Sequence, residues 1–415
     1  MSVICCNHNN SCFKNIFLQN KKFFGLKRYF IFLFLIIFIF NIGVVYSNTT
    51  DENSDYVEDL YANTYDTIDN LDLSKLDELL DGLEDNNIFV HNISDTIKDI
   101  INGNFDIDAD NLFSYVLSVV FGNLKSIFPI CILILIVTII VRILMSFSPE
   151  IFKDGIADII NFVAIGVIVV VLGRYVISVN GIINSTINTM QSIQNIIFPI
   201  LLTMMGAIGA TSSVAIYTPI TTILNTTVSM IMTKFLYPLY LLSFALIVVS
   251  VITKRIKLDK FITFISTLFK TSLGFVFTLF SGIFVIKGIS AGKYDSVSIY
   301  TTKFAVKNYI PLIGSYLSEG FNYIMLSSVL VKNAIGLAGV ILILVVVLSP
   351  VVYLLVLKLL LGLTASFVDV LGCNTISSIV DKVAKIMVFP IAIILGVAFM
   401  FIMSLSLVMC TANLI

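Results

Sequence analysis

Charged residues are scarce in this chain, and their scarcity excludes an ordinary soluble fold. Only 12% of the residues are charged, whereas 58% are hydrophobic and the mean hydropathy is +1.01. A soluble domain carries roughly 25% charged residues. A globule of this size cannot hide so much apolar surface, so that surface must face a lipid bilayer.

The residues that usually carry catalysis and metal binding are also few. The chain has two histidines, His8 and His91, no tryptophan, and six cysteines without a C-x-x-C pair. It lacks an H-E-x-x-H motif, a Walker-type glycine loop and paired acids in adjacent apolar runs. Outside the first residues no basic face is dense enough for nucleic acid. We therefore expect no enzyme activity, no catalytic, metal-binding or cofactor-binding residue, no cofactor and no nucleic-acid partner.

The first 47 residues have the layout of a secretion signal. Basic residues from Lys14 to Arg28 precede an apolar run from Tyr29 to about Tyr46, and Ser47 opens a polar stretch. This order predicts a signal peptide over residues 1–47. An uncleaved signal anchor is the alternative, because the apolar run is long enough to span a bilayer if tilted. Either interpretation places the following segment outside the cytoplasm.

Residues 48–125 form an acidic segment, predicted to be extracytoplasmic. Between Asp51 and Asp110 there are 18 acidic residues and two basic ones, Lys75 and Lys98. Leucines at helical spacing predict a helix near residues 71–83, a second short helix is expected near 93–101, and Asn102-Gly103-Asn104 predicts a turn. These helices would lie on the membrane domain or on a partner; a solvated acidic spacer is the alternative.

Residues 126–415 are predicted to form an all-α polytopic membrane domain. Apolar runs of bilayer length recur along it, and they predict about eight transmembrane helices (range 7–10). These runs cover roughly 126–146, 159–178, 196–213, 216–233, 235–253, 267–286, 334–357 and 386–409. Two interrupted stretches, about 309–331 and 359–377, could be spans, interfacial helices or re-entrant hairpins. The small and polar residues of the Gly-rich stretch Gly206–Ser213 permit close helix packing; a polar pathway lining or a broken helix there is the alternative.

The orientation follows from the densest basic loop, Lys254 to Lys260, which is expected in the cytoplasm. Five crossings from an extracytoplasmic residue 125 place this loop in the cytoplasm. The basic loop and the secretion signal therefore predict the same orientation.

Polar groups inside apolar runs are the remaining candidates for a functional role. A charge in the bilayer centre costs about 2.5–3.5 kcal/mol on insertion scales, so it usually faces protein or water. Asp369 cannot reach the interface as a long side chain does, and should face a polar interior or mark the end of a half-crossing. Glu319 lies in a similarly mixed stretch. Asn225 belongs to a Thr- and Asn-rich run that either supports helix packing or lines a polar pathway.

A set of short motifs resembles the stage III sporulation protein AE family of endospore-forming bacteria. The motifs recur in order along most of residues 110–415. They comprise Lys287-Gly288 with Ser290-Ala291, Thr302-Lys303-Phe304, Asn308, Ile310-Pro311 with Gly314, Leu330 with Lys332-Asn333 and Gly336, Pro219 with Asn225-Thr226, and Thr411-Ala412-Asn413-Leu414.

The resemblance implies a role that no residue reveals by itself. It implies a multi-pass protein of the mother-cell-derived outer forespore membrane, with its acidic segment in the intermembrane space. Its implied partners are the other stage III A sporulation proteins and, across that space, stage II sporulation protein Q, in a transenvelope channel or secretion complex required for forespore development. A stand-alone secondary transporter is the alternative, because it too would have many spans and polar clusters.

Overall fold

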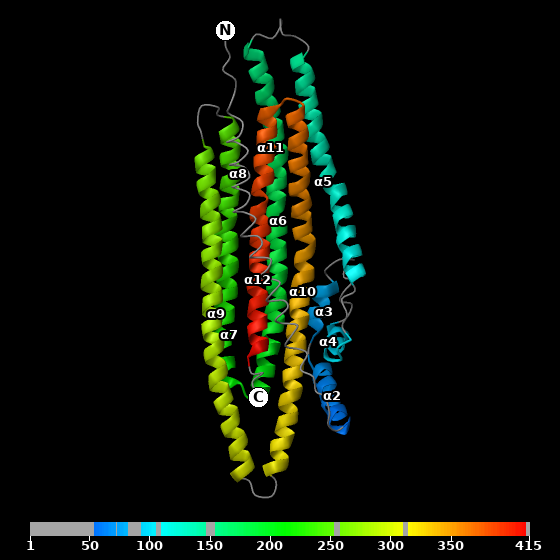
Figure 1. The fold of residues 1–415 in the computed structure, drawn as a ribbon, viewed down its shortest axis with the longest axis vertical. Coiled ribbons are helices and arrows are strands. Elements are labelled where there is room, and N and C mark those ends of the chain that lie inside the picture. The colour runs from blue at the N-terminus through cyan, green and yellow to red at the C-terminus, as the bar shows by residue number, and fades with distance from the viewer. Residues whose placement is uncertain are drawn as a thin grey trace, which may run out of the picture. The chain divides into compact units, whose positions relative to one another are not determined.

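The computed structural model describes residues 54–71, 73–81, 93–104, 109–146, 154–252, 258–309 and 314–411. The predicted signal, residues 1–47, lies outside them. The described residues form helices joined by short turns, without a strand, so the predicted all-α class is confirmed (Figure 1). The helices are α2 (Ser54–Asp69), α3 (Ser74–Asp81), α4 (Ile93–Ile101), α5 (Ala109–Ser146), α6 (Asp154–Ile208), α7 (Thr211–Ile231), the π-helical η1 (Met232–Leu236), α8 (Tyr237–Ile252), α9 (Asp259–Tyr309), α10 (Gly314–Val370), α11 (Asn374–Ile386) and α12 (Val388–Cys410).

Helices α10 and α12 form the centre of the bundle. Helix α10 contacts α4, α5, α6, α9, α11 and α12, and α12 also contacts α6 and α9. Most side chains of α12 are buried. On the α9 side, two ring pairs stack at centroid distances of 4.2 Å (Phe269 with Phe389) and 4.4 Å (Phe277 with Phe399). The most apolar helix is therefore shielded from lipid by its neighbours.

Six helical segments in the described part of the chain are long and apolar enough to cross a membrane, so the predicted count of about eight is not confirmed. The predicted spans 159–178 and 196–213 fall largely on one helix, α6, and the spans 216–233 and 235–253 fall on the unbroken run α7, η1 and α8. A straight helix crosses a bilayer once, whatever its length. At 1.5 Å per residue, the 55 residues of α6 extend about 80 Å, against about 30 Å for the hydrocarbon core.

Polar residues in the middle of α6 explain why two spans were predicted where the structure has one helix. They interrupt the apolar run, but their amide groups donate hydrogen bonds within the bundle and the helix is not broken. The Asn184 amide donates to Asn180 Oδ1 at 2.9 Å, and the Gln194 amide donates to the Ser404 hydroxyl of α12 at 2.5 Å. The two interrupted stretches are mostly helical where they are described: residues 314–331 and 359–370 belong to α10, and residues 371–373 form a turn before α11.

The structure shows the alternative interpretation of Gly206–Ser213, a broken helix, and confirms the predicted turn at Gly103; glycine explains each. Helix α6 ends at Ile208, where Gly209 adopts φ of 89° and the Ala210 N–H donates to the Met205 carbonyl at 2.9 Å. Gly103 closes α4 in the same way with φ of 70°. A left-handed residue at the helix C-terminus satisfies carbonyls that would otherwise lack partners, and glycine adopts it without a Cβ clash.

The acidic segment is folded against the membrane helices, which favours the packed alternative over a solvated spacer. Helix α4 lies against α10 and α3 against α6, while Thr64 of α2 contacts Ser327 of α10 at 3.0 Å between hydroxyl oxygens. The side chains that face inward are apolar and at most 5% exposed: Ile68, Leu73, Leu76, Ile93, Ile97 and Ile100. Helical spacing thus placed these residues on one buried face.

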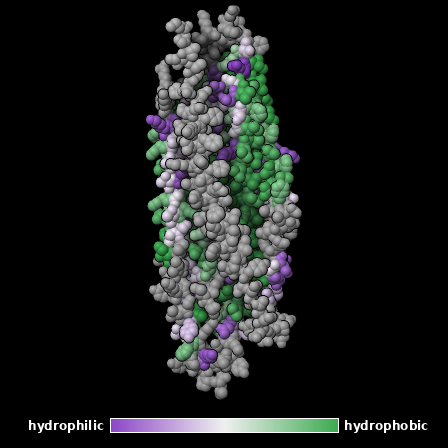
Figure 2. Space-filling model, in the orientation of Figure 1, coloured by the Kyte–Doolittle hydropathy of each residue, from purple (hydrophilic) through white to green (hydrophobic). Residues whose placement is uncertain are grey.

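Exposed large apolar side chains concentrate on α5, α8, the first part of α9 and the last part of α10. On α6 they end at Ile177; the exposed positions after it are small residues, polar residues or Pro199, and the large apolar residues Ile182, Ile196, Ile200 and Leu202 are half-buried. Figure 2 shows a broad hydrophobic surface at the upper right of the view, where α5 lies in Figure 1. Such an uncovered apolar surface suits contact with lipid.

Candidate functional site

The strongest concentration of buried polar groups lies where α6 turns into α7 and where α12 ends. We call Ser213, Tyr217, Asp295, Lys332 and Thr411 the end cluster. These residues come from α7, α9, α10 and the C-terminus of α12, and each is less than 10% exposed. Hydrogen bonds link them in two groups, which meet along one face of α7.

Lys332 is the buried cation of the end cluster. Its side chain is 0% exposed, and its ammonium donates to the main-chain oxygen of Thr411 at 2.5 Å. Thr411 is the C-terminal cap of α12, whose last carbonyls carry partial negative charge. The helix end therefore offsets part of the cost of burying the lysine, and the lysine fixes the helix end.

Asp295 is the buried anion of the end cluster. It lies at the N-terminus of a helix, α7, whereas Lys332 lies at the C-terminus of α12. Its carboxylate, 1% exposed, accepts the main-chain N–H of Ser212 at 2.9 Å and that of Ser213 at 3.0 Å. These are the free N–H groups in the first turn of α7, where partial positive charge favours an anion. The cap Ala210 makes no side-chain hydrogen bond, so α9 supplies the cap that α7 lacks locally.

Tyr217 joins the two groups. Its ring is fully buried on α7, one turn beyond Ser213, and its hydroxyl lies 3.0 Å from the Thr411 hydroxyl. The Thr411 hydroxyl donates to the Leu407 carbonyl at 2.6 Å, so Tyr217 is the donor of the pair. The Ser213 hydroxyl has no hydrogen-bond partner among the described residues. The cluster therefore holds α7, α9, α10 and α12 in one relative position.

Two glycines let α10 approach its neighbours closely beside the end cluster. A Cβ at Gly336 would lie 2.4 Å from Met409 Cγ of α12, and one at Gly339 would lie 2.6 Å from Ile197 Cδ1 of α6. Small residues at helix contacts permit such close packing in membranes. Gly336 belongs to the motif that contains Lys332, so that motif combines a charge contact with a close helix approach.

The other end of the bundle holds Asp369. It lies in the last turn of α10, and its side chain is exposed, not buried in the polar interior that was one expectation. Gly372, with φ of 79°, follows it and ends the helix. A Cβ at Gly372 would lie 3.5 Å from the Arg142 guanidinium, so this arginine of α5 faces the turn. Burial raises the pKa of the Cys373 thiol beside it, and Arg142 opposes that rise.

The remaining predicted residues are dispersed. Asn225 is 8% exposed on α7, and neither its Oδ1 nor that of Asn333 accepts a hydrogen bond from a described residue. The hydroxyls of the threonines around Asn225 donate to main-chain oxygens of their own helix, as helix packing requires. The side chains of Lys303, Asn308 and Glu319 are not described, Gly314 is the first residue of α10, and Pro311 lies outside the described residues.

Sequence reasoning missed Asp295, Tyr217 and Thr411 as members of a site. Asp295 was one acid among several, and its role depends on a helix start 82 residues earlier. The sequence nonetheless contained a feature that indicates the need for such an acceptor. The break at Gly209 predicts a new helix from Thr211, and that helix needs acceptors for its first N–H groups.

Among the described residues, no group of three histidine, cysteine, aspartate or glutamate side chains is placed to hold a metal ion. The described hydrogen bonds of the end cluster mainly join helix ends to side chains. This arrangement suits the control of the relative positions of α7, α9, α10 and α12.

Comparison with known proteins identifies the family to which this chain belongs. The model of the family "Stage III sporulation protein AE" matches residues 91–412. The chain belongs to the stage III sporulation protein AE family. It is 26% identical over 303 residues to the stage III sporulation protein AE of Bacillus subtilis (strain 168), covering 73% of this chain and 75% of that protein. No solved structure matches the chain. Family membership gives the chain a role in sporulation, and its apolar helices make it a multi-pass membrane protein.

Proposed function

We propose that the chain is a non-enzymatic membrane component of the transenvelope channel or secretion complex between mother cell and forespore. The family match over residues 91–412 carries this proposal. The partners would be the other stage III A sporulation proteins and, across the intermembrane space, stage II sporulation protein Q. The membrane would be the mother-cell-derived outer forespore membrane.

The position of the acidic segment supports a large part of the protein lying outside the bilayer. Helix α2 carries five acids and lies beside Ser327, near the start of α10. Charges avoid the hydrocarbon core, so this end of α10 should be in water. Leu355, Leu359 and Leu363 are exposed near the other end. Because the 57 residues of α10 extend about 85 Å, one end can cross the bilayer while the other projects far beyond it.

The orientation of the six spans agrees with this placement. Three crossings, α5, α6 and the run α7–α8, separate the acidic segment from the basic loop that begins at Lys254. An odd number puts the loop in the cytoplasm and the acidic segment outside. The end cluster would then face the compartment in which partners meet.

The test is a deletion of the gene in its own spore-forming host, complemented by the wild-type gene. We expect engulfed forespores that stop developing, few heat-resistant spores, and co-purification of the complemented protein with the other stage III A proteins. Normal spores without the gene would overturn the proposal. Gly362→Ala is a suitable control variant, because a Cβ there would meet no atom within 4 Å.

A stand-alone secondary transporter is the second candidate, favoured by the fully buried Lys332. A buried charge among apolar helices commonly marks a substrate or ion pathway. The purified chain, alone in liposomes, would then catalyse solute uptake that Lys332→Met abolishes. A channel component would require its partners instead.

A further inference from the structure

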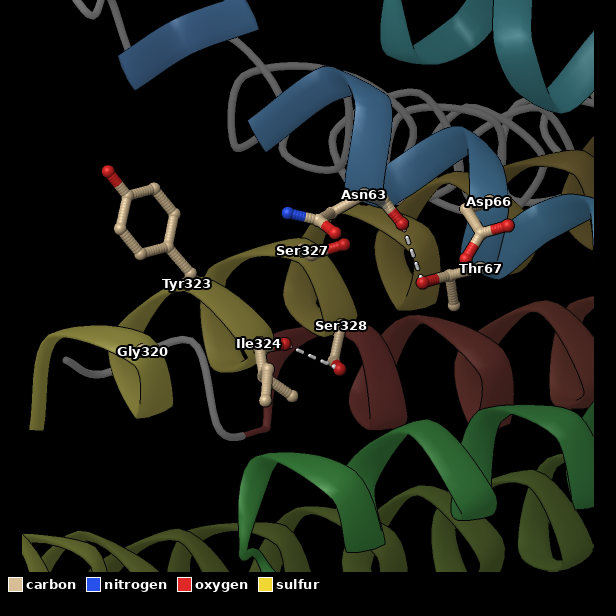
Figure 3. A pocket seen from close by; sticks show the side chains of 8 residues that line it. All are labelled: Asn63, Asp66, Thr67, Gly320, Tyr323, Ile324, Ser327 and Ser328. Carbon is tan, nitrogen blue, oxygen red and sulfur yellow. Dashed lines mark hydrogen bonds between the residues drawn. The ribbon is translucent and has the colours of Figure 1, made fainter. Parts of the chain in front are cut away.

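An open groove of about 400 Å³ lies between α2 of the acidic segment and the first turns of α10 (Figure 3). Its lining comes from both helices, and six of the eight lining residues have polar side chains. The residues are Asn63, Asp66, Thr67, Gly320, Tyr323, Ile324, Ser327 and Ser328. The end cluster shares none of them.

Three hydroxyls of the groove, those of Thr67, Ser327 and Ser328, have already used their protons. Thr67 donates to the Asn63 carbonyl and Ser328 donates to the Ile324 carbonyl, each at 2.7 Å (dashed in Figure 3). Thr64, just behind the groove, donates to the Leu60 carbonyl at 2.7 Å, so its contact with Ser327 must take the Ser327 proton. A hydroxyl has one proton and two lone pairs. Thr67, Ser327 and Ser328 therefore offer acceptors to any occupant.

The charge of the groove also favours an occupant that donates hydrogen bonds. The exposed carboxylate of Asp66 accepts no hydrogen bond from a described residue. The basic residue of the neighbouring helix α4, Lys98, is held by Asp69 at 2.7 Å. Asp66 would repel an anion, and the three hydroxyls offer a neutral acceptor no proton, so the amide of Asn63 is the donor on the α2 side of the lining. The complementary group is a cation that carries N–H donors.

We propose that this groove receives a lysine or arginine side chain from a protein partner in the same compartment. Asp66 pairs with the ammonium or guanidinium, and the oxygens of Ser327, Ser328 and Thr67 accept its remaining N–H groups. Ile324, 61% exposed at the rim, covers the aliphatic stem of the side chain. A lysine or arginine side chain carries one charge at the end of its stem, whereas a free polyamine carries a charge at each end of every methylene run and would place a second cation on this apolar rim. The proposal rests on the proposed function only in that a partner shares the compartment.

Binding can be measured on the full chain in nanodiscs. The probe is a fluorine-labelled glycine-rich pentapeptide with one central arginine, followed by fluorine NMR line broadening over a concentration series. We expect saturable binding that weakens about tenfold or more in Asp66→Asn, because a hydrogen bond to a charged group is lost. Asp99→Asn removes an equal charge from an exposed position on α4 outside the groove, and should change binding less than about twofold.

Two further binding measurements test whether the occupant must carry a positive charge. The same peptide with citrulline, which keeps the shape and loses the charge, should not bind. Asn63→Lys adds an ammonium at the exposed edge of the groove and should abolish binding without lowering the thermal midpoint. Equal affinity for Asp66→Asn and Asp99→Asn would overturn the proposal. So would saturable binding of spermidine with no binding of the arginine peptide. Neither result would affect the deletion phenotype, so the two proposals fail separately.

Discussion

Lys332 donates to the main-chain oxygen of Thr411, although the two residues are 79 positions apart. The contact joins the middle of α10 to the C-terminus of α12, and Tyr217 adds a second bond to Thr411 from α7. Asp295 holds the start of α7 from α9. A buried lysine at a helix C-terminus and a buried aspartate at a helix N-terminus are both in favourable fields. The end cluster is therefore a set of electrostatically matched helix ends.

Replacing Lys332 by Met should loosen the end of α12. The methionine fills the space but leaves the Thr411 carbonyl without its charged donor. We expect faster hydrogen exchange in a peptide covering residues 405–411, with near-normal protein level and few heat-resistant spores. Replacing a buried charge by an apolar side chain can leave stability unchanged, so the midpoint of unfolding is not the deciding measurement. Unchanged exchange at 405–411 would show that the contact does not hold the helix end.

Replacing Asp295 by Leu should destabilise the fold, because two N–H groups at the start of α7 lose their acceptor. Loss of a helix cap costs about 1–2 kcal/mol. Asp295→Asn, which keeps one acceptor oxygen, should cost less. The measurement is thermal unfolding followed by a dye that reacts with Cys131 and Cys373, which are buried in the folded protein.

Asp259→Asn is the control for Asp295. Its carboxylate pairs with Lys382 at 2.6 Å but is 69% exposed, and an exposed pair contributes at most about 1 kcal/mol. An equal shift for Asp295→Leu and Asp259→Asn would contradict the capping role.

The sequence predicts the kind of fold and several local features, and the structure explains where that prediction stops. The break at Gly209 and the turn at Gly103 were accessible because a glycine with a local pattern determines each. The buried faces of α3 and α4 followed from helical spacing. The role of Asp295 was not accessible, because it depends on which helix lies opposite. The length of α6 was misjudged because Gln194 is polar in sequence but donates its amide proton to Ser404, 210 positions away.

Replacing Gly336 by Val should separate α10 from α12, because its Cβ would overlap Met409. The methionine can move its flexible side chain, so we expect a moderate loss, about 1–3 kcal/mol, as for overpacked cores. Gly362→Val on the same helix is the matched control, since no atom lies within 4 Å of its Cβ position and the loss of glycine is the same. Equal thermal midpoints for the two variants would show that the close approach at Gly336 does not contribute to stability.

A single cysteine at Thr211 distinguishes six spans from eight. The residue is exposed at the start of α7, directly after the turn that ends α6. With eight spans, three crossings separate it from the acidic segment, so it would lie in the cytoplasm. With α6 as one continuous span, two crossings separate them, so Thr211→Cys lies on the same side as the acidic segment. In a cysteine-free background, we expect a membrane-impermeant maleimide to label Thr211→Cys and a cysteine at Ser74 from outside, and to label Asp369→Cys only after the membrane is opened. Protection of Thr211→Cys until opening, with Ser74 labelled, would mean that α6 does not cross as one helix and would restore the eight-span arrangement.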